Sequence, residues 1–112
     1  MLIQDRQEYE KITTTLLNAV TANDQSDTFP FSSKEKTIEA FITGTGAVGA
    51  TVTVYGCNTR RIANGIPLAT LVLSGTASDQ AGSVLTFNWP FIYVVLSGIT
   101  GTGAAVTFTV SQ

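Results

Sequence analysis

From residue 34 onward the sequence is a series of short runs in which apolar and polar residues alternate, separated by Gly, Ser, Asn and Pro. Ile38, Ala40 and Ile42 alternate with polar or exposed-type residues along the first run, which is the period-two pattern of a half-buried strand. Such runs at regular spacing are typical of all-β sandwiches and barrels. We therefore predict a single, jelly-roll-like β-sandwich of about seven or eight strands over residues 34–112.

Residues 1–33 follow a different pattern. Tyr9, Ile12, Leu16 and Val20 recur at spacings of three and four, with Leu17 alongside, which matches one face of a helix. Three consecutive threonines at 13–15 oppose this interpretation, because β-branched residues favour strands. The segment is predicted to be an N-terminal helix or arm with a linker, packed either on its own domain or on a neighbouring subunit.

A six-residue segment, Ile-Thr-Gly-Thr-Gly-Ala, occurs at residues 42–47 and again at residues 99–104. Each copy follows an apolar run and precedes a strand rich in Thr and Val. Because Gly readily adopts positive φ angles, the repeat predicts two pseudo-symmetric hairpins with equivalent turns. Convergence in simple turn chemistry is the alternative explanation.

The ionisable residues exclude several kinds of chemistry. The chain has no His, so it can form neither a Ser-His-Asp triad nor a Cys-His pair, and its single cysteine, Cys57, allows no internal disulfide or multi-thiolate metal site. Residues 44–49 match the glycine spacing of a dinucleotide-binding loop, but a β pattern follows where a helix is required. We expect a non-enzymatic protein with no cofactor and no metal.

Charge also limits the partners. Six basic residues against eight acidic ones give a net charge of -2, which is unsuited to binding nucleic acid. No apolar run is long enough to cross a membrane as a helix, and residues 1–6 lack the features of a secretory signal. Partners are therefore expected to be proteins, with no nucleic acid and no membrane, and synthesis is expected in a cytoplasm.

The charges are unevenly distributed along the chain. Eleven of the 14 lie in residues 1–39, and the remaining 73 residues carry only Arg60, Arg61 and Asp79. The chain contains 18 threonines. Residues 68–73 are more continuously apolar than the other runs, as in a strand covered on both faces or lying at an interface. Because interface cores are depleted in charge, we expect a homo-oligomer or a subunit of a larger assembly.

Two further features indicate recognition. Arg60 and Arg61 form an isolated basic pair, which is either a solvated loop tip or an anchor for a carboxylate-bearing partner. Trp89 and Phe91 flank Pro90, and their rings are expected either in the core or in an aromatic contact patch that could also stack on sugars.

Most of residues 35–112 resemble the small β-sandwich virion proteins of tailed bacteriophages, of the head-decoration (cement) type. The resemblance rests on the two Gly-Thr-Gly-Ala turns, on residues 55–58 (Tyr-Gly-Cys-Asn) and on residues 89–94 (Trp-Pro-Phe-Ile-Tyr-Val). It implies a viral structural protein on the virion surface, made in the host cytoplasm. Such a protein is often trimeric and binds and stabilises the lattice of the major capsid protein or another virion protein.

The alternative function is that of a sugar-binding β-sandwich module in a phage tail or host-attachment protein. Under either function, the residues expected to contact a partner are Arg60, Arg61, Trp89, Phe91, Tyr9, Ile12 and Leu16.

Overall fold

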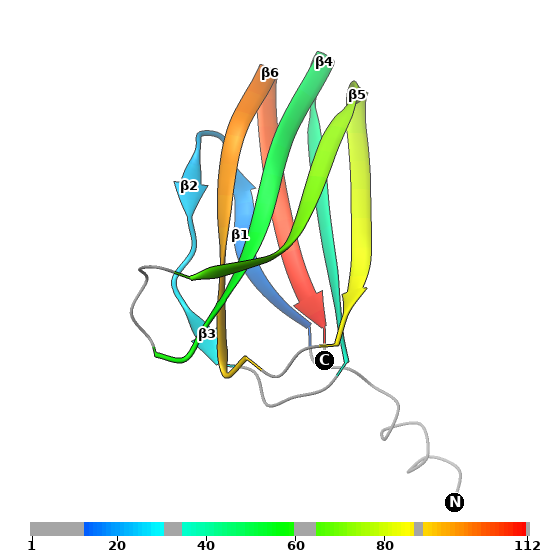
Figure 1. Ribbon diagram of the computed structural model, residues 1–112. Helices are drawn as coiled ribbons and strands as arrows, with labels where there is room; N and C mark the ends of the chain where they lie inside the picture. The colour runs from blue at the N-terminus through cyan, green and yellow to red at the C-terminus, as the bar shows by residue number, and fades with distance from the viewer. Residues whose placement is uncertain (1–12, 31–34, 60–64, 87–88, 112) are drawn as a thin grey trace, which may run out of the picture.

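The computed structural model describes residues 13–30, 35–59, 65–86 and 89–111. These residues form six strands and no helix (Figure 1): β1 Thr13–Val20, β2 Asp24–Gln25, β3 Phe29–Pro30, β4 Lys36–Cys57, β5 Ile66–Leu85 and β6 Phe91–Ser111. The predicted all-β class is confirmed.

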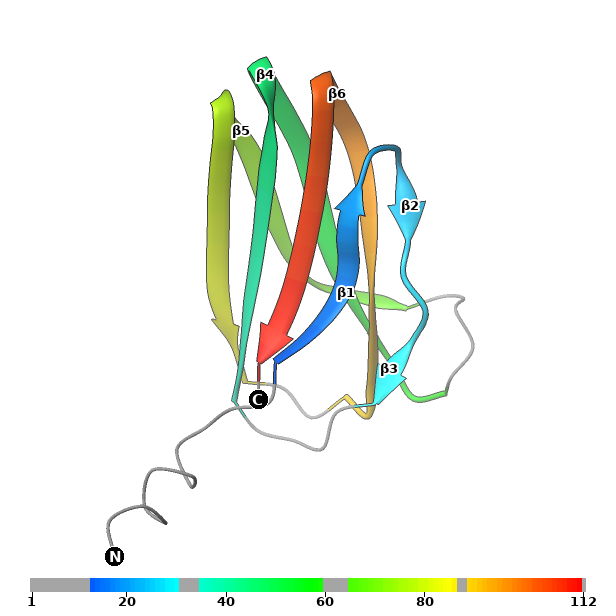
Figure 2. The same ribbon diagram turned by 180° about the vertical axis from the view of Figure 1, so that it is seen from behind.

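All strand pairs are antiparallel, and the strands follow the order β1-β6-β4-β5, with β2 and β3 also paired to β6. The three long strands do not lie flat. Each runs along one layer, turns a corner and continues in a second layer that packs against the first, as Figure 2 shows from behind. The hydrogen-bonded sheet therefore folds over into a β-sandwich.

The halves of the long strands divide between the two layers. The first layer contains β1 together with residues 36–43, 78–85 and 105–111. The second layer contains β2 and β3 together with residues 47–57, 66–76 and 91–100. This is the strand order of a jelly roll. Six strands are assigned instead of seven or eight because each of the three long strands continues unbroken through its corner.

The core lies between the two layers and follows the predicted alternation. Along β4, Ile38, Ala40 and Ile42 face inward, and Val52 and Val54 do so after the corner. The non-glycine, apolar residues with no exposed surface are Ala40, Ile42, Val52, Val54, Ile92, Val94, Val106, Phe108 and Val110. Apolar side chains from both layers thus fill the interior, as sheet-on-sheet packing requires.

The predicted helix is wrong over residues 13–20, which form strand β1. The β-branched threonines favour this outcome, and two register shifts along β1 explain the misleading spacing. An irregularity adds a residue to one strand, so the core-packed Leu17 and Val20 stand three residues apart, as they would on a helix. Tyr9 and Ile12 lie outside the described residues.

The predicted division between residues 1–33 and 34–112 falls within residues 31–34, which are not described. Strands β1, β2 and β3 precede this point, and all three pair with β6. Residues 13–30 therefore belong to the same sandwich layers as the rest of the chain.

The repeated hexapeptide forms two corners at corresponding places in β4 and β6, and not hairpins. The fifth residues of the two copies, Gly46 and Gly103, have φ angles of 71° and 65°, whereas of the third residues only Gly101 has a positive φ, 117°. One copy takes β4 from the first layer to the second, and the other takes β6 back. Thr45 pairs with Thr102, so the two corners lie side by side and antiparallel.

Candidate functional site

The residues predicted to contact a partner are distributed unevenly. Arg60 and Arg61 lie outside the described residues, as do Tyr9 and Ile12. Leu16 is half-buried on β1 and packs against the edge of the core. The two aromatic candidates, Trp89 and Phe91, are both half-buried at the start of β6. Of the predicted contact residues, therefore, the described part of the chain brings together only this pair.

Tyr55 and Tyr93 stack beside each other near these aromatic residues. Their ring centroids are 5.1 Å apart and their planes differ by 8°, and they are direct cross-strand partners on β4 and β6. The backbone amide of Gly65 donates to the Tyr93 hydroxyl at 3.2 Å. Residue 65, which follows the segment containing the two arginines, is thereby fixed at the tyrosine pair.

Trp89 lies directly over the backbone of Gly56. A Cβ atom placed on Gly56 would come within 2.6 Å of Trp89 Cγ and 2.9 Å of Leu68 Cδ1. Only glycine permits this close approach, so the half-buried ring packs on the last part of β4. We call Tyr55, Trp89, Phe91 and Tyr93 the aromatic end.

Cys57 lies at the same end, as a buried free thiol with 7% of its surface exposed. It pairs with Phe91 across β4 and β6, and its Sγ donates weakly to the Phe91 carbonyl oxygen over 3.9 Å. The thiol is therefore part of the packing, in agreement with the structural role expected of an inert buried cysteine.

The outer surface of the second layer carries no charge at its described positions on the long strands. We call this surface the uncharged face. Strand register places its members side by side: Thr51, Thr53, Thr70, Val72, Ser74, Val95 and Ser97. Among the described residues the most exposed large apolar side chain is Val72, at 64%. The mostly apolar run at residues 68–73 is therefore covered on only one face within this chain.

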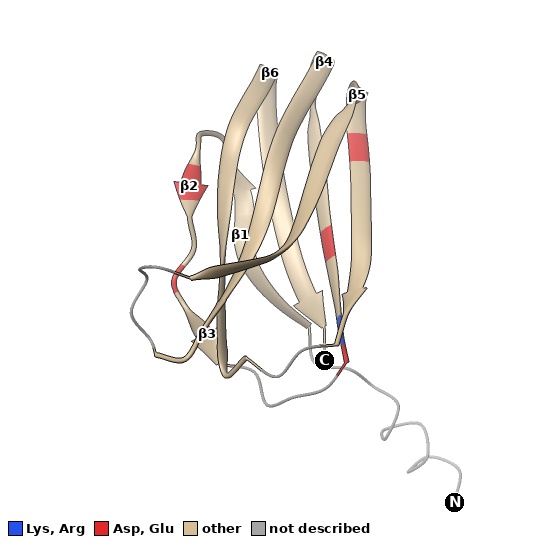
Figure 3. Ribbon diagram, viewed as in Figure 1, with Lys and Arg blue, Asp and Glu red and all other residues tan. Residues whose placement is uncertain are grey.

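Figure 3 shows where the described charges lie. Asp24 and Asp27 lie on and just after β2, while Glu39 interrupts the outer surface of the first layer. Lys36, at the start of β4, has no exposed surface, and burial lowers the pKa of its ammonium group below the usual 10.5. The long strands of the two outer faces thus differ: Glu39 stands among the threonines of the first layer, and the long strands of the second layer carry no charge at their described outward positions.

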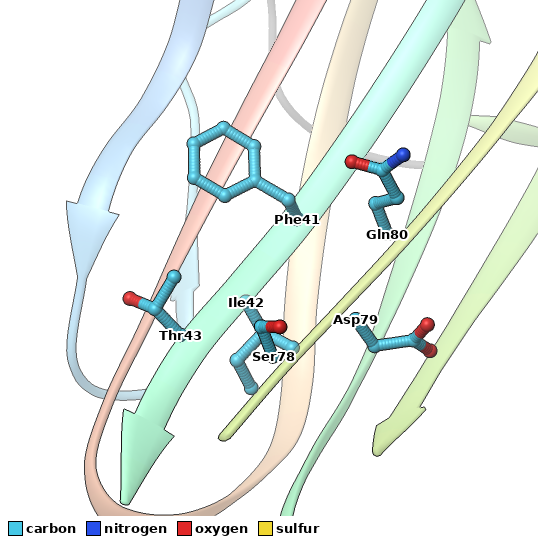
Figure 4. Close-up of a pocket in the computed structure, with 6 residues that line it drawn as sticks. All are labelled: Phe41, Ile42, Thr43, Ser78, Asp79 and Gln80. Carbon is cyan, nitrogen blue, oxygen red and sulfur yellow. The ribbon is translucent and has the colours of Figure 1, made fainter. Parts of the chain in front are cut away.

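A shallow hollow of about 450 Å³ lies near the corner of β5 (Figure 4). It is lined by Phe41, Ile42, Thr43, Ser78, Asp79 and Gln80. The Asp79 carboxylate already accepts a hydrogen bond from the Ser74 amide at 2.8 Å. Its role is therefore to hold the turn, and the hollow offers no described cation or second carboxylate to a ligand.

The described residues contain no group of three metal-ligating side chains. Within the same ranges no helix has the length and apolarity needed to cross a membrane.

Sequence comparisons identify no relatives: no protein-family model matches the chain, and no curated protein matches it significantly. Solved structures do match. The prophage-derived protein YomS of SPBc2 has a TM-score of 0.56 at 16% identity, over 92% of this chain and 94% of its own. A protein of Bacillus endospore appendages, described as a family of disulfide-linked pili, has a TM-score of 0.54 at 15% identity, over 91% and 82%.

A third match comes from a bacterial adhesin. A cleaved adhesin domain of Lys-gingipain from Porphyromonas gingivalis has a TM-score of 0.50 at 10% identity, covering 90% of this chain and 72% of that one. At such identities the likeness concerns the fold alone. The chain is a β-sandwich of a kind that occurs in a prophage protein, a pilus protein and an adhesin domain.

Proposed function

We propose that this protein is a non-enzymatic virion structural protein, a capsid decoration (cement) protein that binds the major capsid protein lattice and stabilises the particle. The observation that carries the proposal is the uncharged face, where threonines surround the exposed Val72. A free surface normally carries interspersed charges, whereas interface cores are depleted of them. Such a face is suited to burial against other protein.

The proposed mechanism is adhesive. Each copy buries a modest Thr-rich area across a junction between subunits, and many copies add their weak contacts through avidity. Arg60 and Arg61 are proposed to anchor a carboxylate-bearing partner, because the guanidinium group binds carboxylates in two-pronged geometry. The segment before β1, with Tyr9 and Ile12, is proposed as a second contact.

Binding to shells that lack this chain tests the proposal. We expect the protein to bind such shells and to raise their melting temperature. Ser97→Glu places a charge on the uncharged face and should weaken binding by about tenfold or more, since burying an unpaired charge costs several kcal/mol. Thr15→Glu, equally exposed on the first layer, is the matched control and should bind normally. Equal binding by both variants would contradict the proposal.

The second contact needs a separate deletion. Removing residues 1–12 leaves β1 intact, because β1 begins at Thr13, whereas a longer deletion would remove Leu17 from the core. Weaker shell binding by the truncated protein is expected. Unchanged binding would show that this segment makes no contact with the particle.

A sugar-binding module of a tail or host-attachment protein is the second candidate. It is supported by the half-buried Trp89 at the aromatic end, since flat rings with one accessible side suit stacking on sugars. Glycan-array binding by the wild type, lost in Trp89→Ala and kept in Trp89→Phe, would favour it. Thermal melting of both variants controls for the packing of Trp89 on Gly56.

A further inference from the structure

One side of the sandwich is formed by a single strand. β5 is the last strand in the sheet order, and among the described residues it pairs only with β4. Because residues 66–76 lie in the second layer and residues 78–85 in the first, β5 is the edge of both layers at once (Figure 1).

Between residues 69 and 76 this edge lacks the features that normally prevent edge-to-edge pairing. Over its 20 residues β5 has no Lys or Arg and one charge, Asp79, whose carboxylate is bonded to the Ser74 amide. Its Pro67 lies at the start, where the ladder with β4 also shifts register. From residue 69 to residue 76 the strand is regular and uncharged, which natural sheet edges usually avoid.

The direction of the Ser74 amide identifies the open backbone groups. This amide is bonded to the Asp79 side chain, so it points away from β4. Amides alternate in direction along a strand, and the ladder is regular between residues 69 and 76. Thr70 and Val72 therefore present their N–H and C=O groups on the outer side of the edge.

The opposite side of the sandwich is blocked. β1 has two register shifts along its pairing with β6 and a positive φ of 51° at Ala19, whose amide is bonded to the Thr107 hydroxyl. In the second layer that side consists of two-residue strands, with Asp24 on one and Pro30 on the other. Bulges, proline and charge are the usual protections of an edge.

We propose that two copies of this chain pair antiparallel along β5 and form a twofold symmetric dimer. The partner strand is proposed to come from a second copy of this chain. Because the described sandwich has one open edge, two copies can form a continuous sheet only by pairing that edge with itself. When a strand pairs with itself, a charged side chain near the axis approaches the same side chain of the other copy and the two repel each other. Self-pairing therefore requires a strand without charges at the contact, and residues 66–76 carry none. The phage resemblance instead implies a trimer, so the oligomeric state in solution distinguishes the two expectations.

One axis satisfies both layers. Two antiparallel neighbouring strands in a sheet are related by a twofold axis perpendicular to that sheet. The two layers are stacked face to face, so an axis perpendicular to the second layer also passes through the first. The same axis can therefore relate residues 78–85 of the two copies. Inward-facing Leu71 and Leu73, with 6% and 1% exposure, would continue the core of one copy into the other. On the outer surface, Val72 of one copy would form a cross-strand pair with Val72 of the other.

Analytical ultracentrifugation of the full chain tests the proposal. The wild type should sediment as a dimer. Thr70→Pro removes an amide that β4 does not use, so the fold should persist while the dimer dissociates. Val72→Lys should raise the dimer dissociation constant by about a hundredfold, because like charges meet at the twofold contact. Thr15→Lys, on β1, is the matched control and should remain dimeric.

Mixing variants gives a sharper result. Val72→Lys and Val72→Asp should each be monomeric alone and should pair when mixed, because opposite charges then meet across the edge. A wild type that stays monomeric at the highest measurable concentration would overturn the proposal, and so would a dimer that persists in Thr70→Pro and Val72→Lys. Neither outcome bears on shell binding, which Ser97→Glu tests without touching β5.

Discussion

At the β1 side the sandwich ends in two register shifts, two very short strands and the aspartates of the β2 region. At the β5 side it ends in one long strand with a single charge, which is regular from residue 69 to residue 76 and irregular at Pro67 and at Ala77, whose φ is 68°. Both sides belong to the same two layers and share one core. They differ in how side chains bond the backbone near the edge. On the β1 side, side chains accept hydrogen bonds from the amides of Ala19, Val94 and Ile99, whereas on the β5 side Asp79 accepts one from the Ser74 amide.

This difference shows that a sheet edge is defined by local irregularity as much as by residue type. Ser26 illustrates the irregular side: its amide donates to the Val94 carbonyl at 2.9 Å, and its hydroxyl accepts from the Val94 amide at 3.0 Å. Ser26 thus makes the two hydrogen bonds to Val94 that a residue of a neighbouring antiparallel strand would make with its backbone. Asn23 similarly accepts a hydrogen bond from the Ile99 amide. Side-chain hydrogen bonds of this kind take the place of a regular strand partner on the β1 side.

The largest effect is expected at Leu17, which fixes β1 to the core with 3% of its surface exposed. Leu17→Ala should lower the free energy of unfolding by about 3 kcal/mol, because it removes buried methyl groups and leaves a cavity. Denaturant unfolding measures the loss. Leu16→Ala, at the half-buried neighbouring position, is the control and should cost clearly less. Equal losses would mean that β1 is not held by its inward side chain.

Ser26→Ala should have the next largest effect. The variant removes the hydroxyl that accepts from the Val94 amide, and a buried amide without a partner costs about 1–3 kcal/mol. Hydrogen exchange should show faster exchange at Val94, and unfolding should show the loss of stability. Ser97→Ala, exposed on the uncharged face, should change stability by less than about 0.5 kcal/mol. An unchanged Val94 exchange rate would refute the role given to Ser26.

The sequence predicted the all-β class correctly because apolar and polar residues alternate along the strands. Ile38, Ala40 and Ile42, for example, face inward as this pattern indicates. It failed at β1, where irregular pairing gave Leu17 and Val20 a helical spacing. An irregularity arises from contacts with a partner strand, and a single sequence does not contain those contacts. The local pattern was therefore ambiguous before the partner, β6, was known.

The candidate site was harder to predict than the fold. The sequence identified Trp89 and the absence of charge, but it gave no sign that Val72 would be the most exposed large apolar residue. Its neighbours Leu71 and Leu73 are equally apolar and face the core. The sheet order decides which strand is an edge, and that order depends on pairings between residues far apart in the sequence.

Asp79→Ala should affect the β5 side by a smaller amount. It frees the Ser74 amide from its bond to the carboxylate and should cost about 1 kcal/mol, the usual net value of one hydrogen bond. Amide exchange at Ser74 should become faster. Gln80→Ala, the exposed neighbour on β5, is the control. If Ser74 exchange stays slow, this end of the β5 edge is protected by something other than Asp79.

The smallest effect concerns Lys36, a buried cation at the start of β4 that pairs with Leu85 of β5. Burial lowers the pKa of Lys36 in the folded protein below the usual 10.5. Between the lowered pKa of Lys36 in the folded protein and its pKa of 10.5 in the unfolded chain, the unfolded chain binds more protons than the folded protein. The free energy of unfolding should therefore rise with pH across this window and level off above pH 10.5. Lys36→Met should rise less steeply over this window. Tyr55 and Tyr93 are present in both proteins, so the difference between the two curves isolates Lys36. If the free energy of unfolding of the wild type and of Lys36→Met changes with pH in parallel, then Lys36 has an ordinary pKa, and burying its ammonium group beside β5 does not destabilise the fold.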